Sequence, residues 1–465
     1  MKDGFAIGGV LIVIGLILQV NIGVVDWSVF HFPVNGIVLG IFLLLLLTMF
    51  CLRRSVDTFQ FLGSYGVAVP AMALAVILTI IMGLTRQTTD GLWLNSMLTF
   101  WPFVLIYLYV AVSLGLVVFK QSSRLFSSFR SRTLIPSLLF HLGLFIALTT
   151  ATLGSADRQT LKLMTMEGVD EWRALDGKQR VVELPFSVEL QKFIMETYDD
   201  GMPKRYASEI KIHPKKGQIV QTTVDVNKPV EVDGWHIYQY DYQTSGGTIG
   251  EISIFQLVYD PWLPVVYTGF FLMLVGALCL FLFSLPLAGC VDYICKHRRQ
   301  TVLFCVLLTV VFVCIHHFMP ILHAKKLVPA LQSPWFVPHI IAYMIAYTLM
   351  GVAAIMAVYR LLTHVKLGVE DTLVYIGIAF ITVGMLFGAF WAKEAWGHYW
   401  EWDPKETWAA ITWLSYLVYI HWRIYRPQRL RPALWMLLVC FVLLQMCWWG
   451  IRFLPSAQGA SVHVY

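Results

Sequence analysis

The sequence has 465 residues, of which 58% are hydrophobic and 13% are charged, and its formal net charge is +6. Soluble domains are about 45–50% apolar and about 25% charged. This composition therefore excludes a soluble globular protein and indicates an integral membrane protein. None of the eight cysteines forms a Cys-x-x-Cys pair, so we expect neither a disulfide framework nor a thiol redox site.

Apolar runs that are long enough to cross a bilayer recur along the chain. A transmembrane helix needs about 20 mostly apolar residues. The first run begins just after Met1 and no convincing small-residue cleavage site follows it, so we interpret it as a retained helix and not as a signal peptide. The predicted transmembrane helices, about eleven in number, are 5–24, 34–52, 66–85, 100–119, 134–153, 262–286, 301–320, 338–361, 372–391, 407–424 and 433–454.

Basic residues gather in every second loop between these runs. Loops rich in Lys and Arg stay on the cytoplasmic side of a membrane, so we predict that the N-terminus lies inside and the C-terminus outside. Lys325 and Lys326 fall on the outer side and oppose this orientation weakly. The residues that set it are Arg53, Arg54, Lys120, Arg124, Arg130, Arg132, Lys296, Arg298, Arg299, Arg360, Lys366, Arg423, Arg426, Arg429 and Arg431.

One polar segment, at about 155–260, interrupts the apolar runs and lies outside in this topology. Three stretches rich in β-branched and aromatic residues predict strands, at Val181–Leu190, Ile219–Val226 and Ile249–Tyr259. We find no catalytic arrangement in this segment and interpret it as a docking or scaffold domain. The predicted fold class is an all-α polytopic membrane protein with one β-rich extracytoplasmic domain.

The most unusual stretch is 391–413, which reads WAKEAWGHYWEWDPKETWAAITW. Trp and Tyr gather at bilayer interfaces, but such a belt explains one or two rings and not six tryptophans among six charged residues. Stacked aromatic faces suit a flat, largely apolar ligand with charged edges, such as haem. Lys393, Lys405 or Arg452 would meet the carboxylates of this ligand.

Four histidines form two pairs in the predicted topology. His339 and His463 lie on the outer side with the Trp-rich stretch, whereas His141 and His421 lie toward the inner side of two helices. Neutral imidazole is the usual protein ligand of haem iron, and ionisable residues within a membrane are functional candidates. A single histidine at a helix end is more often merely interfacial, so the hypothesis depends on the pairing.

The quoted residues resemble a known family. WGHYWEWDPKETWAAITWLSYLVYIH is similar to the tryptophan-rich signature of the haem-handling proteins of cytochrome c biogenesis, and LVPALQSPWFVPH resembles its CcsA/ResC branch. FHLGLFIALTTATLGS, LPFSVELQKFIMETYDDGMPKRYASEI and VNKPVEVDGWHIYQYDYQ resemble the CcsB/ResB partner. The resemblance implies a System II cytochrome c synthase in which both halves are fused. It implies three parts: N-terminal helices at 1–130, a CcsB/ResB-like part at 131–290 and a CcsA/ResC-like part at 291–465.

The resemblance also implies a reaction and a site. Haem b would be exported from the cytoplasmic side and joined by thioether bonds to the Cys-x-x-Cys-His motif of apocytochrome c, as in a holocytochrome c synthase of the haem lyase type. His141 and His421 would ligate haem iron within the membrane, and His339 and His463 would ligate it at the outer site. No catalytic residue is assigned. The haem-binding loop would comprise Trp396, Gly397, Tyr399, Trp400, Trp402, Asp403, Pro404, Lys405, Glu406 and Trp408.

Partners and location follow from the same resemblance. They are apocytochrome c, a thioredoxin-like thiol reductant, a membrane electron carrier and the lipid bilayer, without nucleic acid. The expected location is the bacterial inner membrane, with haem attachment on the periplasmic side. Alternatives are a transmembrane bis-His electron-transfer cytochrome, a haem exporter without ligase activity, and the haem lyase of System I, against which the CcsB-like part argues.

Overall fold

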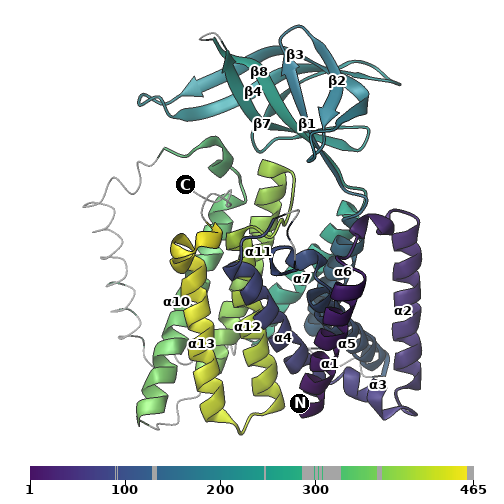
Figure 1. Cartoon of the computed structure of the whole chain (residues 1–465). Helices are drawn as coiled ribbons and strands as arrows, with labels where there is room; N and C mark the ends of the chain where they lie inside the picture. Colours follow the sequence, from purple (N-terminus) through teal and green to yellow (C-terminus); the bar gives the residue numbers. More distant parts are fainter. Residues whose placement is uncertain are drawn as a thin grey trace.

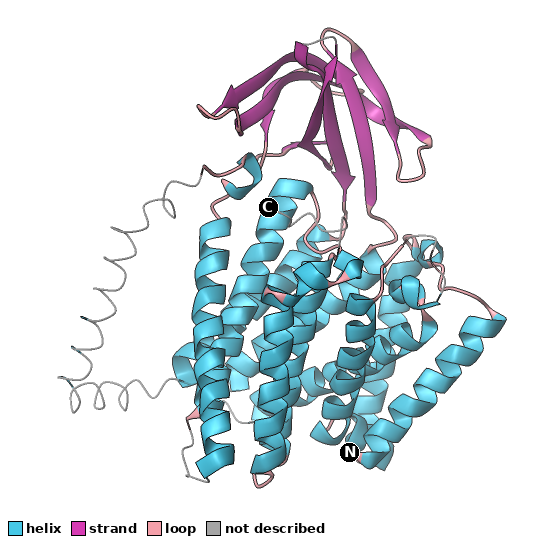
Figure 2. Cartoon of the chain, turned by 60° about the vertical axis from the view of Figure 1, so that its left-hand side comes forward, coloured by secondary structure: helices cyan, strands magenta, loops and turns pink. Residues whose placement is uncertain are grey.

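The computed structural model describes residues 1–88, 91, 93–127, 134–245, 248–284, 326–363 and 369–457, together with residues 298, 302 and 306. A helical bundle carries an antiparallel sheet at one end, and the N-terminus lies at the opposite end of the bundle (Figure 1). The view of Figure 2 gives the same two-part arrangement. The predicted helix at 301–320, apart from residues 302 and 306, and His463 lie outside the described residues.

The bundle is built from long apolar helices and one short connecting helix. Their many lipid-facing side chains are apolar, as a membrane requires; Val20 and Leu44 are 68% and 63% exposed. The helices are α1 (Lys2–Asn21), α2 (Val34–Leu52), α3 (Asp57–Leu62), α4 (Tyr65–Leu84), α5 (Trp101–Ser127), α6 (Leu134–Gly154), α7 (Leu263–Ser284), α10 (Phe336–Thr363), α11 (Glu370–Trp396), α12 (Pro404–Tyr425) and α13 (Leu430–Trp448).

Nine helices in the described part of the chain are long and apolar enough to cross a membrane. The predicted count of about eleven is therefore not confirmed. The span predicted at 407–424 coincides with α12, which packs between α4 and α13 but is less apolar than its neighbours. Charged residues lie near both ends of α12, and its many Trp and Tyr rings contribute little to mean hydropathy.

The polar segment forms one sheet of eight antiparallel strands in the order β5-β4-β3-β2-β1-β8-β7-β6. Two of the predicted stretches fall within β3 and β8, and Ile219–Val226 extends one residue beyond each end of β5, which confirms the β-rich prediction. The strands are β1 (Gln159–Met166), β2 (Asp170–Leu175), β3 (Val181–Thr197), β4 (Pro203–Pro214), β5 (Val220–Asp225), β6 (Val230–Val232), β7 (Trp235–Ser245) and β8 (Thr248–Tyr259).

The sheet curls around a core of its own. Side chains alternate between buried and exposed along β1, and between buried and partly buried along the middle of β3, as the period of two of a strand requires. The hydroxyls of Ser208 in β4 and Ser253 in β8 lie 2.8 Å apart although these strands are not neighbours in the sheet. The two ends of the sheet therefore approach one another around Leu163, Leu190, Ile210 and Phe255, which are fully buried.

Glycines bring particular helices into close contact. A Cβ at Gly143 of α6 would lie 2.5 Å from the carbonyl oxygen of Gly269 in α7, and one at Gly276 of α7 would lie 2.6 Å from the nitrogen of Phe140. Small residues let membrane helices approach until their backbones touch. This contact holds the helix that carries His141 against α7.

Candidate functional site

His141 of α6 and His421 of α12 meet in the half of the bundle away from the sheet. Their ring centroids lie 6.4 Å apart, with the ring planes at 79°. The two residues are 280 positions apart in the chain, and only the packing of α6 and α12 in one bundle brings them together. Phe140 and Tyr65 flank the pair, with ring centroids 6.0 Å from those of His141 and His421.

Backbone contacts determine which ring nitrogen of each histidine carries the lone pair. Nδ1 of His141 lies 2.6 Å from the carbonyl oxygen of Ser137, and Nδ1 of His421 lies 2.8 Å from that of Leu417. Because a carbonyl oxygen can only accept, Nδ1 must donate and Nε2 retains the lone pair. This is the usual way in which proteins orient metal-ligating imidazoles.

The pair can therefore offer two neutral imidazole ligands to one metal ion. An imidazole nitrogen binds a metal ion at about 2.0–2.1 Å, so two rings with centroids 6.4 Å apart can both reach an ion between them. Axial ligation of haem iron fits this arrangement.

His339 lies in the first turn of α10, at the end of the bundle next to the sheet. Its Nδ1 lies 2.8 Å from the carbonyl oxygen of Gly384, so His339 has the same tautomer as the other two histidines. Its ring lies 5.8 Å from that of Trp391 and occupies a slot that Gly388 leaves open. The proposed partner of His339, His463, lies outside the described residues.

The Trp-rich loop connects α11 to α12. α11 ends at Gly397, whose φ of 81° is in the left-handed region, and a Cβ there would lie 2.8 Å from Val258 of the sheet. Asp403 caps α12 by accepting from the backbone nitrogen of Glu406, and the Glu406 carboxylate accepts from the backbone nitrogen of Asp403. Pro404 occupies the first helical turn. This capping box stabilises the N-terminus of α12.

The loop closes the wall of a cavity of about 520 Å³, within the range of about 300–1,000 Å³ of ligand pockets. Tyr399, Trp400 and Trp402 line the cavity, and the Trp400 and Trp402 rings meet edge to face at 5.7 Å. Most of the other lining residues come from α4, α5, α6, α7, α11 and α12. The N-terminal helices α4 and α5, to which no role was assigned from sequence, thus form part of this wall.

The cavity extends from the loop toward the histidine pair. Leu144, one helical turn after His141, lines it, and so do Trp413 and Leu414 of α12. Phe140, beside His141, lies 6.5 Å from the Trp413 ring. From Pro404 to His421, α12 rises about 25 Å at about 1.5 Å per residue, so the cavity covers much of the distance between loop and pair.

The structure does not bring all predicted site residues to this cavity. Gly384 and Gly388 of α11 face Tyr343 and His339 of α10, whereas Leu386 and Ala389 of the same helix line the cavity. α11 therefore separates His339 from Trp400 and Trp402. Trp396 lies on the side of His339, where its ring is 5.1 Å from that of Trp391.

Other predicted loop residues have structural contacts. Trp408 is 2% exposed and packs against Gly83 of α4, away from the cavity lining. Lys393, considered for ligand carboxylates, is buried and donates from Nζ to the carbonyl oxygen of Gly397. Lys405 and Arg452, which were considered for the same role, are not among the described residues that line the cavity.

Sequence reasoning missed Arg158. It follows α6 and is the only basic residue among the described residues that line the cavity. Its Nη2 lies 3.4 Å from Oε1 of Glu401 in the Trp-rich loop. The sequence signal that could have identified it is its position, because a basic residue just after a transmembrane helix on the predicted outer side departs from the positive-inside rule.

The sheet contacts the end of α11 and the segment that precedes α10. Gln256 of β8 donates to the carbonyl oxygen of Trp396, and Asn227 donates to that of Pro329 at 2.8 Å. Tyr198 donates to the carbonyl oxygen of Leu327, and Gln332 donates to that of Lys204. The sheet thus holds the end of α11 and the segment that leads into α10 and His339.

Comparisons with known proteins match two segments of the chain. Residues 262–457 match the family model described as cytochrome C assembly protein, and residues 134–251 match that of the ResB-like family. The cytochrome c biogenesis protein CcsA of Chlamydomonas reinhardtii is 32% identical over 210 residues, which cover 42% of this chain and 58% of that protein. CcsA of Prochlorococcus marinus strain MIT 9515 is 32% identical over 198 residues, covering 34% and 62%. The chain thus spans about three fifths of the length of these relatives.

Proposed function

We propose that this chain, in which a ResB-like segment precedes a segment that matches cytochrome C assembly proteins, acts as a System II holocytochrome c synthase. It takes haem b from the cytoplasmic side and attaches it to apocytochrome c at the outer face. The sheet domain and the Trp-rich loop then lie on the periplasmic side of a bacterial inner membrane, as the distribution of basic residues favours.

The observation that carries the proposal is the meeting of His141 and His421. His141 belongs to the ResB-like segment and His421 to the cytochrome c assembly segment, and their rings lie 6.4 Å apart with both Nδ1 atoms committed to backbone carbonyls. Each matched segment contributes one of the two ligands. A site of this kind requires both segments, which is a physical reason for their fusion.

We infer a path for haem from the cavity geometry. Haem bound by His141 and His421 would move along the cavity toward Tyr399, Trp400 and Trp402, where aromatic faces stack on the porphyrin. Arg158 would pair with a propionate at the outer end. Because α11 separates the cavity from His339, haem would have to pass the end of α11 at Gly397 to reach that ligand.

The bond-forming step needs orientation more than acid–base chemistry. Each cysteine thiol of the apocytochrome adds across a vinyl group of haem, so that one C–S bond forms, the S–H bond breaks and the hydrogen goes to the other vinyl carbon. No atom is lost. Holding two thiols and two vinyl groups in register is the main contribution of the protein. The thiols must arrive reduced, which implies a thioredoxin-like reductant and a membrane electron carrier.

Co-expression with an apocytochrome c in a host without its own maturation system tests the proposal. We expect His141→Ala and His421→Ala each to lower the yield of covalent haem at least about tenfold, because even changes to residues around a metal ligand cost about 10–100-fold in affinity or activity. Haem staining after denaturation measures this yield. His236→Gln, in β7 of the sheet, is the matched control and should retain the wild-type yield.

The outcomes separate the alternatives. If the pair variants lose bound haem while the wild-type protein matures no cytochrome, the bis-His electron-transfer cytochrome or the exporter replaces the synthase. If both variants mature cytochrome c like the wild type, His141 and His421 are not the inner ligands.

A further inference from the structure

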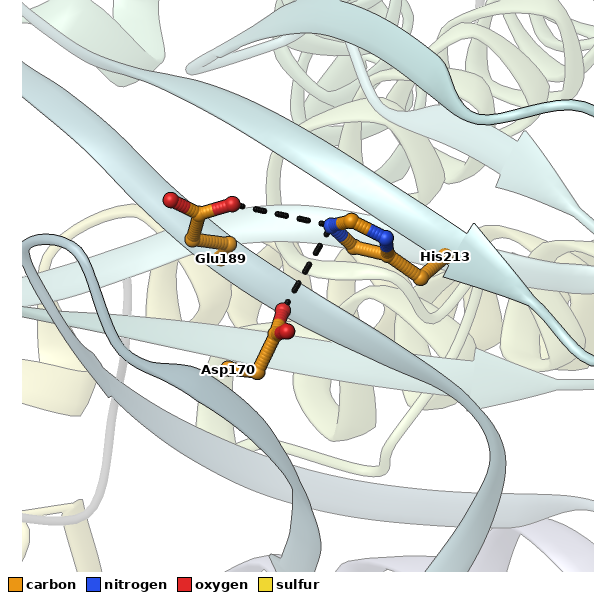
Figure 3. A group of neighbouring side chains, drawn as sticks. All are labelled: Asp170, Glu189 and His213. Atoms are coloured by element: carbon orange, nitrogen blue, oxygen red, sulfur yellow. Dashed lines mark ion pairs between the residues drawn. The ribbon is translucent and has the colours of Figure 1, made fainter.

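A second group of potential ligands lies on the sheet, outside the proposed haem path. Asp170 of β2, Glu189 of β3 and His213 of β4 point toward one another from three adjacent strands (Figure 3). Each offers a ligand atom, and these atoms lie within 4.8 Å of one another. Nε2 of His213 lies 3.5 Å from Oδ1 of Asp170 and 3.6 Å from Oε2 of Glu189.

Strand register explains how these side chains come together. Asp170 is directly opposite Glu189 in the β2–β3 ladder, and Glu189 is directly opposite Lys211 in the β3–β4 ladder. His213, two residues after Lys211, therefore projects from the same face of the sheet. The strand pairing itself places two carboxylates and one imidazole at neighbouring positions.

The arrangement places two like charges side by side and leaves His213 without a good hydrogen bond. Carboxylates at directly opposed positions of an antiparallel pair repel each other. Nε2 of His213 is shielded from solvent and has no hydrogen-bond partner among the described residues. Its distances to the two carboxylates are too long for good N–H···O hydrogen bonds, which are usually about 2.7–3.2 Å. The side chains thus face a common point at ion-pair distances, and Nε2 of His213 makes no hydrogen bond to either carboxylate.

We propose that Asp170, Glu189 and His213 bind a divalent transition-metal ion, with Zn²⁺ as the best match. Imidazole nitrogen and carboxylate oxygen are ligands of Zn²⁺ at about 2.0–2.2 Å. Two atoms at that distance from a tetrahedral ion lie about 3.4 Å apart, close to the 3.5 and 3.6 Å found here. The Asp170 side chain is 51% exposed, so the fourth position is open to water or to a donor from a partner.

The ion would tie together three neighbouring strands of the outer domain. Because the ligands converge only when β2, β3 and β4 are paired, the metal ion binds the folded sheet and not the unfolded chain, and it stabilises the sheet by mass action. The site belongs to the sheet alone, since its ligands come from strands that contribute nothing to the cavity lining. Metal binding and haem binding are therefore separable.

Zinc titration of the purified full-length protein tests this site. The protein in detergent is treated with a chelator, dialysed and equilibrated with Zn²⁺, and bound metal is counted by elemental analysis. Because other histidines also bind Zn²⁺, the informative quantity is the difference from wild type. We expect His213→Gln and Glu189→Gln each to lose about one Zn²⁺ per chain, whereas Glu209→Gln, on the same face of β4, keeps the wild-type count.

A second readout excludes misfolding. Haem retained during purification should be the same in all variants, since the haem ligands lie elsewhere. Zn²⁺ should also raise the thermal midpoint of the wild type and of Glu209→Gln, and not that of His213→Gln. Equal zinc counts in wild type, His213→Gln and Glu189→Gln would overturn the proposal and leave the contacts of His213 with Asp170 and Glu189 as purely structural.

Discussion

At the scale of single residues, three of the predicted histidine ligands are oriented in the same way. Each donates from Nδ1 to a backbone carbonyl, of Ser137, Leu417 or Gly384, which determines the tautomer and the direction of Nε2. For His141 and His421 the carbonyl lies four residues earlier in the same helix, where helix geometry supplies it. For His339 it belongs to a neighbouring helix, so the orientation of that ring depends on how α10 and α11 pack.

Gly388 allows that packing, which leads to a prediction. An added Cβ at Gly388 would lie 2.8 Å from Nδ1 and Cε1 of His339, closer than real contacts allow. We expect Gly388→Ala to cost about 1–3 kcal/mol through overpacking and to reduce covalent haem attachment by displacing the His339 ring. Detergent-phase thermal unfolding and haem staining measure the two effects.

Gly351 of α10 provides the control for this prediction. A Cβ there would make only an ordinary contact, at 3.7 Å from Phe441. Gly351→Ala should be neutral or stabilising, because alanine favours helix by about 1 kcal/mol over glycine. If Gly388→Ala behaves like Gly351→Ala, the imidazole of His339 does not depend on this slot.

At the scale of elements, the Asp403–Glu406 capping box positions the Trp-rich loop. The Glu406 carboxylate accepts from the backbone nitrogens of Glu401 and Asp403, and Thr407 donates to the carbonyl oxygen of Trp402. Trp402 has a φ of 59°, which is costly for a bulky residue and persists only where surrounding contacts hold it. Asp403 and Glu406 therefore shape the loop, and Tyr399, Trp400 and Trp402 line the cavity.

Removal of the cap tests this division of roles. We expect Asp403→Ala to destabilise α12 by about 0.5–2 kcal/mol and to lower haem retention by loosening Trp400 and Trp402, although Asp403 does not line the cavity. Thermal unfolding and the haem-to-protein ratio check this. Ser64→Ala is a matched control, since Ser64 precedes α4 without a side-chain cap. Unchanged haem retention in Asp403→Ala would show that the cap does not position the rings.

At the scale of the whole molecule, Asp157 joins segments that are distant in sequence. One carboxylate oxygen accepts from the backbone nitrogen of Phe32 and contacts Nδ1 of His31, and the other accepts from Asn35 and from Nε1 of Trp262. The residue thereby ties the start of α2 and the start of α7 to the end of α6. Burial alone would raise the pKa of Asp157, but these hydrogen bonds lower it below its usual value.

The lowered pKa gives a prediction with a definite sign. The stabilisation is present above the unfolded pKa of about 3.9 and is lost as pH falls through the lower folded pKa. At neutral pH, Asp157→Asn should cost about 1–3 kcal/mol, because an amide offers one acceptor oxygen where two are used. Asp199→Asn, an exposed control, should have little effect.

Thermal midpoints of both variants, measured from pH 7 down to pH 3, check this prediction. The difference between Asp157→Asn and wild type should shrink only at the acid end of that range. A difference that is already absent at pH 7 would contradict the role assigned to the carboxylate.

Local pattern determined much of this protein from sequence alone. Apolar runs predicted the helices because a transmembrane helix needs about 20 apolar residues, and stretches rich in β-branched and aromatic residues predicted strands such as β8. The composition of 391–413 indicated a haem-binding loop, and the positions of His141 and His421 within apolar runs indicated ligands of haem iron. Each of these signals is contained in a short window of the chain.

Tertiary structure decided the relations between those windows. Helix packing sets the 6.4 Å separation of His141 and His421. It also places residues of α4 and α5, and Arg158, in the wall of the cavity. The separation of His339 from the cavity depends on which face of α11 each glycine occupies. The convergence of Asp170, Glu189 and His213 depends on strand register. Packing and register join residues that are far apart in the chain, and no local pattern contains that information.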